Sequence, residues 1–230
     1  MKQTTKLLSL GLCAVILFSG CFLKSVHPLV TEKDAVFVED LEGVFEGEDS
    51  RWTFVNDPET LPELQLSGDN YDGTFTVEPD SGSTIFENQS MYLVLYEDIK
   101  PNSIDTTVFV GLIGEFNGNK FLDLSLLDMR IEGNTFRNSH LFAVHTFSRI
   151  SLTDEYLTLY FFKDSWIREL IMGNRVRIKH ERIPDGITGD SDDILITAST
   201  KELQKFIMKY GHETEPFDDP IGLKRISRAL

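Results

Sequence analysis

Cysteine is scarce in this chain, and so are the sequence motifs of common enzyme classes. The 230 residues include only two cysteines, Cys13 and Cys21. None of the patterns G-x-S-x-G, S-x-x-K, H-E-x-x-H or G-x-x-x-x-G-K occurs, and no dinucleotide-binding fingerprint is present. The sequence therefore predicts no catalytic residue of these classes, no metal ligands and no cofactor, although serine, histidine and aspartate could still meet in space.

The chain also lacks an apolar run that could span a bilayer, which takes roughly 20 residues. Its most apolar run, Leu7–Phe18, follows the basic residues Lys2 and Lys6 and precedes the small residues Ser19 and Gly20. This order is typical of a secretory signal peptide. We expect residues 1–20 to be removed. A cut elsewhere and an uncleaved anchor are the alternatives.

The five residues Leu17–Cys21, Leu-Phe-Ser-Gly-Cys, resemble the lipobox of bacterial lipoproteins with a type II signal peptide. Phe18 departs from the pattern, which usually has Leu there. The resemblance implies that Cys21 carries lipid and becomes the mature N-terminus, so that the protein is anchored to a membrane without crossing it. Phe22 after the cysteine implies an outer-membrane location in a diderm host, facing the periplasm or the surface.

Basic side chains are few relative to acidic ones. There are 22 Lys and Arg against 37 Asp and Glu, which gives a formal net charge of −15. Removal of the signal would take away Lys2 and Lys6 and make the net charge more negative. Nucleic acid would be repelled by such a chain. Cys13 would leave with the signal and Cys21 would be lipidated, so no disulfide is expected. A hydrophobic core must stabilise the domain, and 17 Phe residues can fill one.

The remaining length suits a single domain. We expect a lipidated tether at residues 21–34, one β-rich domain at 35–217, and a loosely held tail at 218–230. Short runs of strand composition separated by turn signals predict a mainly β fold, an antiparallel lipocalin-like barrel or sandwich. The expected strands include a first hairpin ending in Arg51–Asn56, then Leu64–Leu66, Gly73–Val77, Met91–Tyr96, Thr107–Phe116, Lys120–Leu124, Leu141–Ile150, Tyr156–Phe162, Arg175–His180 and Ile194–Thr197.

Two segments near the C-terminus predict short helices instead. Residues 164–173 begin with Asp164 as N-cap and end in Gly-Asn. The second helix starts at a capping box made by Ser199 and Glu202, and its apolar stripe of Leu203, Phe206, Ile207 and Tyr210 should pack on the barrel.

Histidines and clustered carboxylates are the remaining candidates for chemistry. His140 and His145 are five residues apart, so a regular strand would place them on opposite faces. The acidic run 190–193 lacks the order of a calcium loop. A solvated turn is the favoured interpretation there, as it is for Asn117-Gly118-Asn119, which predicts a hairpin. His27, His180 and His212 are interpreted as isolated polar residues.

Two further resemblances concern the family. Gly43-Val44-Phe45 followed by Trp52 is similar to the Gly-x-Trp start of lipocalin-like barrels, with Phe45 where that family has Trp. The lipobox, residues 25–34 and the late segment 195–206 together resemble a family of bacterial lipoproteins of uncharacterised function. This resemblance implies a secreted β-rich domain and carries over no functional residues.

These observations favour a lipid-anchored cell-envelope protein whose barrel is not an enzyme and binds a small apolar ligand or an envelope protein. A structural or interaction module with a solid core is the first alternative. The second is an envelope hydrolase with His140 or His145 as general base, which requires one of these rings beside a serine hydroxyl or a carboxylate.

Overall fold

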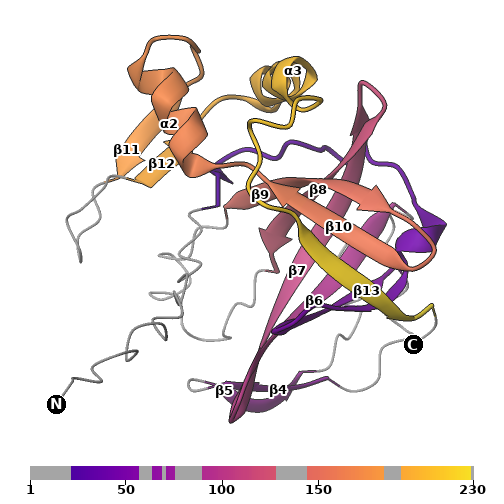
Figure 1. Ribbon diagram of the computed structural model, residues 1–230. Coiled ribbons are helices and arrows are strands. Elements are labelled where there is room, and N and C mark those ends of the chain that lie inside the picture. Colours follow the sequence, from indigo (N-terminus) through magenta and orange to yellow (C-terminus); the bar gives the residue numbers. More distant parts are fainter. Residues whose placement is uncertain are drawn as a thin grey trace, which may run out of the picture.

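The computed structural model describes residues 22–56, 64–68, 71–75, 90–127, 144–183 and 193–228 (Figure 1). Its elements in chain order are β1 (Lys24–Ser25), the 3-10 helix η1 (Glu39–Leu41), β2 (Gly43–Glu46), β3 (Ser50–Val55), β4 (Leu64–Gly68), β5 (Tyr71–Phe75), β6 (Met91–Lys100), β7 (Ser103–Phe116), β8 (Asn119–Leu126), β9 (His145–Leu152), β10 (Tyr156–Phe161), α2 (Asp164–Met172), β11 (His180–Ile183), β12 (Asp193–Ile196), α3 (Thr200–Tyr210) and β13 (Ile221–Ser227).

Eight of these strands form a closed antiparallel barrel. The order β2-β3-β6-β7-β8-β9-β10 follows the chain, and β13 closes the ring between β10 and β2. Closure leaves the barrel strands no free edge. The predicted mainly β, lipocalin-like fold with two helices near the C-terminus is therefore confirmed as a barrel. A separate ribbon of β4 and β5 lies beside β7 (Figure 1).

The first hydrophobic core fills the inside of the barrel. Its aromatic residues contact one another in series: the Phe45 and Phe54 rings are 5.9 Å apart, and Phe54 also contacts Trp52 and Tyr92. Side chains on this inner face alternate with outward ones, as the pleat of a strand requires. The other buried residues of this core are Leu41, Val94, Ile113, Leu122, Leu124, Ile150, Leu157, Leu159, Phe161 and Leu223.

A second core lies on the outer wall of the barrel, beneath α2 and α3. The two helices and the strands β11 and β12 are inserted between β10 and β13, and Figure 1 shows them gathered on one side of the barrel. Phe206 of α3 contacts the rings of Phe162 and Trp166, and it is almost fully buried. The predicted packing of α3 on the barrel is thus present. Its capping box also forms, with Glu202 accepting from the Ser199 amide at 2.9 Å.

The N-terminal segment packs much more closely than the tether that we expected. Within residues 22–34, Leu23, Leu29 and Val30 are buried in the second core. β1 pairs with β9 and β12 and extends the sheet where β9 leaves β10. We call residues 22–35 the N-terminal arm. Its apolar residues follow no regular period, which is why the sequence pattern did not predict their burial.

One buried carboxylate fixes this arm to the barrel. Asp123 of β8 points to the outer side, and its side chain is 2% exposed. Oδ2 accepts the amides of Leu29 and Val30 at 2.6 and 2.9 Å, while Oδ1 lies 2.9 Å from Nδ1 of His145. A buried carboxylate is tolerated because these donors replace water. A polar contact therefore holds the arm on the barrel together with apolar packing.

The end of the chain also differs from the loosely held tail that we expected. Residues 221–227 form β13, which supplies the eighth barrel strand, and only residues 229–230 lie outside the described part there. Gly43 has a φ of +123°, and a Cβ at this residue would lie 2.2 Å from the carbonyl oxygen of Ser227. Closure of the ring at this point therefore requires glycine.

Two local predictions need correction. The strand expected at 175–180 is wrong except for His180, because the amides of Arg175 and Val176 donate to the Leu170 carbonyl and end α2. Lys163, not Asp164, is the N-cap of α2, and Asp164 pairs with Arg168 within the helix. The strand expected from Leu141 begins at His145, and residues 141–143 lie outside the described residues.

Replacing the buried carboxylate should release the arm. Asp123→Ala leaves the amides of Leu29 and Val30 without an acceptor, and we expect a loss of about 2–6 kcal/mol in unfolding free energy, since each buried unsatisfied group costs about 1–3 kcal/mol. Asp123→Asn keeps an acceptor oxygen and should lose less. Denaturant titration measures both variants. Amide hydrogen exchange that stays slow at both residues in Asp123→Ala would contradict this account.

Candidate functional site

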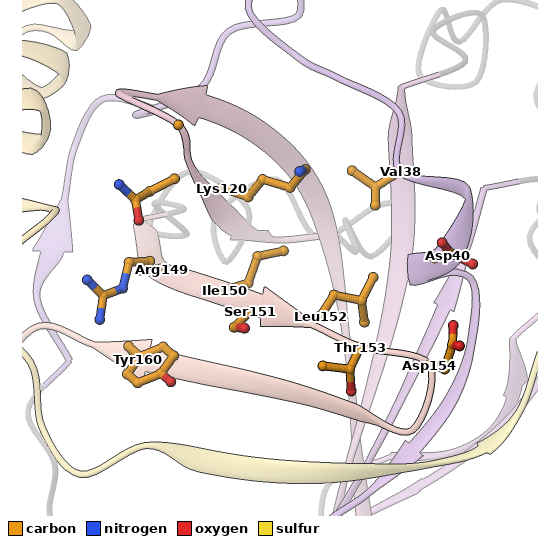
Figure 2. Close-up of a pocket in the computed structure, with 12 residues that line it drawn as sticks. Val38, Asp40, Lys120, Arg149, Ile150, Ser151, Leu152, Thr153, Asp154 and Tyr160 are labelled. Carbon is orange, nitrogen blue, oxygen red and sulfur yellow. The ribbon is translucent and has the colours of Figure 1, made fainter.

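A cleft of about 550 Å³ opens at the end of the barrel where η1, the β7–β8 turn and the β9–β10 hairpin meet (Figure 2). We call it the rim cleft. It is open to solvent on one side and combines apolar and charged side chains. The residues that line it are Val38, Asp40, Gly118, Asn119, Lys120, Arg149, Ile150, Ser151, Leu152, Thr153, Asp154 and Tyr160.

The cleft exists because two neighbouring hairpins end at different heights on this rim of the barrel. The turn at Asn117 and Gly118, where φ is 50° and 74°, ends the β7–β8 hairpin as the Asn-Gly sequence predicted. Pairing of β8 with β9 therefore stops at Lys120 and Ile150, whereas β9 continues to pair with β10 as far as Leu152. The last residues of β9 project beyond β8 and leave a gap that η1 faces.

An apolar stripe and one free amine make up the central part of the cleft. Ile150 and Leu152 come from the inner face of β9, and Val38 approaches from the segment before η1. Figure 2 shows the Lys120 side chain reaching over Ile150 toward Val38. Within the described residues no carboxylate contacts the Lys120 amine. This part of the cleft could therefore hold an apolar group next to an anionic one.

The two acidic residues at one end of the cleft share one arginine. Arg228 reaches Asp40 at 2.7 Å and Asp154 at 2.9 Å. Arg225 donates to the backbone carbonyls of Asp40 and Asp154 at 2.5 and 2.8 Å. These contacts join η1, the β9–β10 turn and β13, so they hold the rim together at this end of the cleft.

Arg149, at the other end of the cleft, also contacts other parts of the protein. Its guanidinium lies 4.7 Å from the ring centre of Tyr160 and 4.3 Å from that of Phe217. It donates to the carbonyls of Gly211 and Glu213. Burial lowers the pKa of Arg149. One nitrogen of this cation therefore anchors the turn after α3, and the two rings hold the guanidinium in place at this end of the cleft.

The position of Val38 depends on a tyrosine inside the barrel. The Tyr92 hydroxyl accepts the Val38 amide at 2.7 Å and donates to the Val38 carbonyl at 2.9 Å, while Phe37 stacks on the Tyr92 ring. Tyr92 is fully buried, and burial is the main cause that raises its pKa to about 12. The hydroxyl therefore stays protonated at neutral pH and fixes one wall of the cleft.

The histidines do not gather at this cleft. His145 meets the carboxylate of Asp123, as the hydrolase hypothesis required of one ring, but that carboxylate also holds the arm. Ser25 pairs with His145 across β1 and β9, yet Ser25 is fully buried and its hydroxyl donates to the His27 carbonyl. His140 lies outside the described residues. These contacts assign His145 a structural role.

The other candidates are dispersed. His27 and His212 are exposed, and Nδ1 of His180 lies 2.8 Å from the Ile178 carbonyl. Of the acidic run, residues 190–192 lie outside the described part, and Asp193 pairs with Lys24 at 2.7 Å. In the described ranges no group of three or more His, Cys, Asp or Glu could hold a metal ion, and none of the helices there is long and apolar enough to cross a membrane.

Comparison with known proteins gives no match. No protein-family model fits the sequence, no curated protein is similar to it, and no solved structure resembles the fold closely enough to be matched. The function must therefore be argued from the residues themselves.

Tyr92 makes stability depend on pH in the alkaline range. Its ordinary pKa of 10.0 applies in the unfolded chain and about 12 applies in the barrel, so below pH 10 both states keep the proton. Between pH 10 and 12 the unfolded state ionises first, and we expect a loss on the order of 2–3 kcal/mol. In urea titrations, Tyr92→Phe should not show this loss of unfolding free energy between pH 10 and 12, while Tyr156→Phe, at an exposed residue, should still show it. If the unfolding free energy of both variants falls equally steeply with pH, Tyr92 is not the cause.

Proposed function

We propose that the protein is a lipid-anchored component of the bacterial cell envelope, whose barrel is a non-enzymatic module that binds an envelope protein. The observation that carries this proposal is the filling of the barrel. Phe45, Phe54 and Tyr92 are among the largest fully buried side chains and contact one another on the inner face. A barrel filled by its own rings binds through its outer surfaces.

The geometry of the arm supports membrane anchoring through Cys21. The next residue, Phe22, already contacts the domain: its ring lies 4.6 Å from that of Phe161, and its backbone bridges to Lys163. A lipid on Cys21 would therefore leave the domain directly at the start of α2. The linker between membrane and domain would be very short, so the domain would be held close to the membrane surface.

A small apolar ligand in the rim cleft is the second candidate. The cleft volume of about 550 Å³ lies within the roughly 300–1,000 Å³ of ligand pockets, and its apolar stripe ends at a free amine. The hydroxyl of Ser148, on the same inner face of β9, is the one buried side-chain polar atom in the described part that lacks a partner. Against this candidate, the cleft is open and mainly polar, whereas carriers enclose most of the ligand.

Anchoring can be tested with the two cysteines as a matched pair. We expect Cys21→Ser to abolish incorporation of radioactive palmitate and to change the membrane fractionation of the protein, because the thiol is the acceptor of the lipid. Cys13→Ser lies in the signal and should be labelled normally. Labelling that persists in Cys21→Ser, or that is lost in both variants, would rule out lipidation at Cys21.

Native mass spectrometry of protein from its own host separates the two binding candidates. We expect the mass of the lipidated chain without a bound small molecule, because the inner face is filled. If an adduct is found, Leu152→Arg in the cleft should remove it and Ile226→Arg, at a side chain 54% exposed outside the cleft, should not. That pattern would support the ligand carrier in place of the protein-binding module.

A further inference from the structure

A groove between α3 and the chain after α2 collects positive charge on an acidic protein. Its volume is about 250 Å³, and its walls carry Arg175 and Arg177 on one side and Lys205 and Lys209 on the other. Lys179 and Lys201 continue the two rows. These six cations are all exposed, and they make up six of the 22 Lys and Arg residues in a chain with a net charge of −15. We call this feature the basic groove.

Most of this charge is not neutralised within the protein. In the described ranges no carboxylate pairs with Arg175, Arg177 or Lys205. The one acid that lines the groove is Glu202, and it accepts the amide and the hydroxyl of Ser199. The Ser199 side chain is the main cause that lowers the pKa of Glu202, with Lys179 and Lys205 as smaller causes. The cations thus face solvent with one carboxylate among them.

The floor of the groove is apolar. Val176, Ile178, Phe206 and Tyr210 lie between the two rows, and Ile178 and Phe206 belong to the second core. The ring of Tyr210 contacts Phe206 at 5.0 Å and carries the Lys209 amine at 4.7 Å. A groove of this kind suits a ligand with apolar groups on one side and anionic groups on the other.

The first wall offers backbone pairing as well as charge. Exposed Arg175, Arg177 and Lys179 alternate with the inward Val176 and Ile178, which is the period of an extended chain. Within the described part, the Arg177 amide has no hydrogen-bond acceptor. An extended segment laid along this wall could therefore accept from the backbone while its side chains alternate between the cations and the apolar floor.

We propose that the basic groove binds an extended acidic segment of a partner protein, with acidic and apolar residues at alternate positions. The proposal rests on the proposed function and names the chemistry of the partner. A peptide is favoured over a lipid surface by the first wall, where the Arg177 amide lacks an acceptor within the described residues and exposed cations alternate with apolar residues. An extended chain can match both features, whereas a lipid headgroup can match only the charge.

The test uses the full chain in a nonionic detergent and a fluorescein-labelled peptide of eight residues that alternates Glu and Leu. We expect saturable binding by fluorescence anisotropy that weakens as salt is added. Arg175→Glu combined with Lys205→Glu should reduce affinity about tenfold or more, because two attractive contacts become repulsive. The control, Lys33→Glu with Lys224→Glu, makes the same charge change at exposed residues outside the groove and should change affinity less than about twofold.

Three results would overturn the proposal. One is equal weakening by the two double variants, which would mean that the peptide responds only to net charge. Another is an affinity for an alternating Glu and Ser peptide equal to that for the Glu and Leu peptide, which would show that the apolar floor does not contribute to binding. The last is no peptide binding, together with calorimetric binding of dihexanoyl phosphatidylglycerol that only the groove variant abolishes, which would assign the groove to lipid headgroups. None of these results alters palmitate labelling or the native mass, so failure here is distinguishable from failure of the proposed function.

Discussion

The buried carboxylate of Asp123 connects the two cores, and much of the outer layer depends on it. Strand alternation sends Leu122 into the barrel and turns Asp123 outward, beneath the arm. A buried charge needs donors, and the amides of Leu29 and Val30 with the ring of His145 provide them. α3 then rests on the arm, because Thr200 donates to the Pro28 carbonyl at 2.6 Å. The basic groove, one wall of which is α3, is thus positioned indirectly by a residue of the barrel.

Much of the barrel was predictable from the sequence because its signals are local. Alternation within Leu157–Phe161, the Asn-Gly turn and the capping box at Ser199 each depend on a few neighbouring residues, and each is found in the structure. The arm and β13 were not predicted. The apolar residues of the arm lack a period, and the strand after Pro220 follows an acidic stretch that resembles a tail. Their burial depends on surfaces provided by distant parts of the chain.

The rim cleft shows the same division between local and long-range signals. The turn at Asn117 was recognised, but the cleft results from the offset between that turn and the β9–β10 hairpin, which reaches farther at this end of the barrel, and this offset is a matter of register. Nor could the sequence show that Asp40 and Asp154 share Arg228, or that Tyr92 holds Val38. The candidate site therefore results from the pairing of strands, and no sequence motif marks it.

The basic groove was hidden for a related reason. Its cations occur with two different periods, every second residue from Arg175 to Lys179 and every fourth from Lys201 to Lys209. The first period fits an extended chain, and the second fits a helix. Neither row forms a continuous basic run that the sequence would reveal. Only the packing of α3 against the chain after α2 brings them together. Gathering like charges disfavours the compact state, so a groove that concentrates cations on an otherwise acidic protein is more readily understood as a surface for an anionic partner than as a means of stabilising the fold.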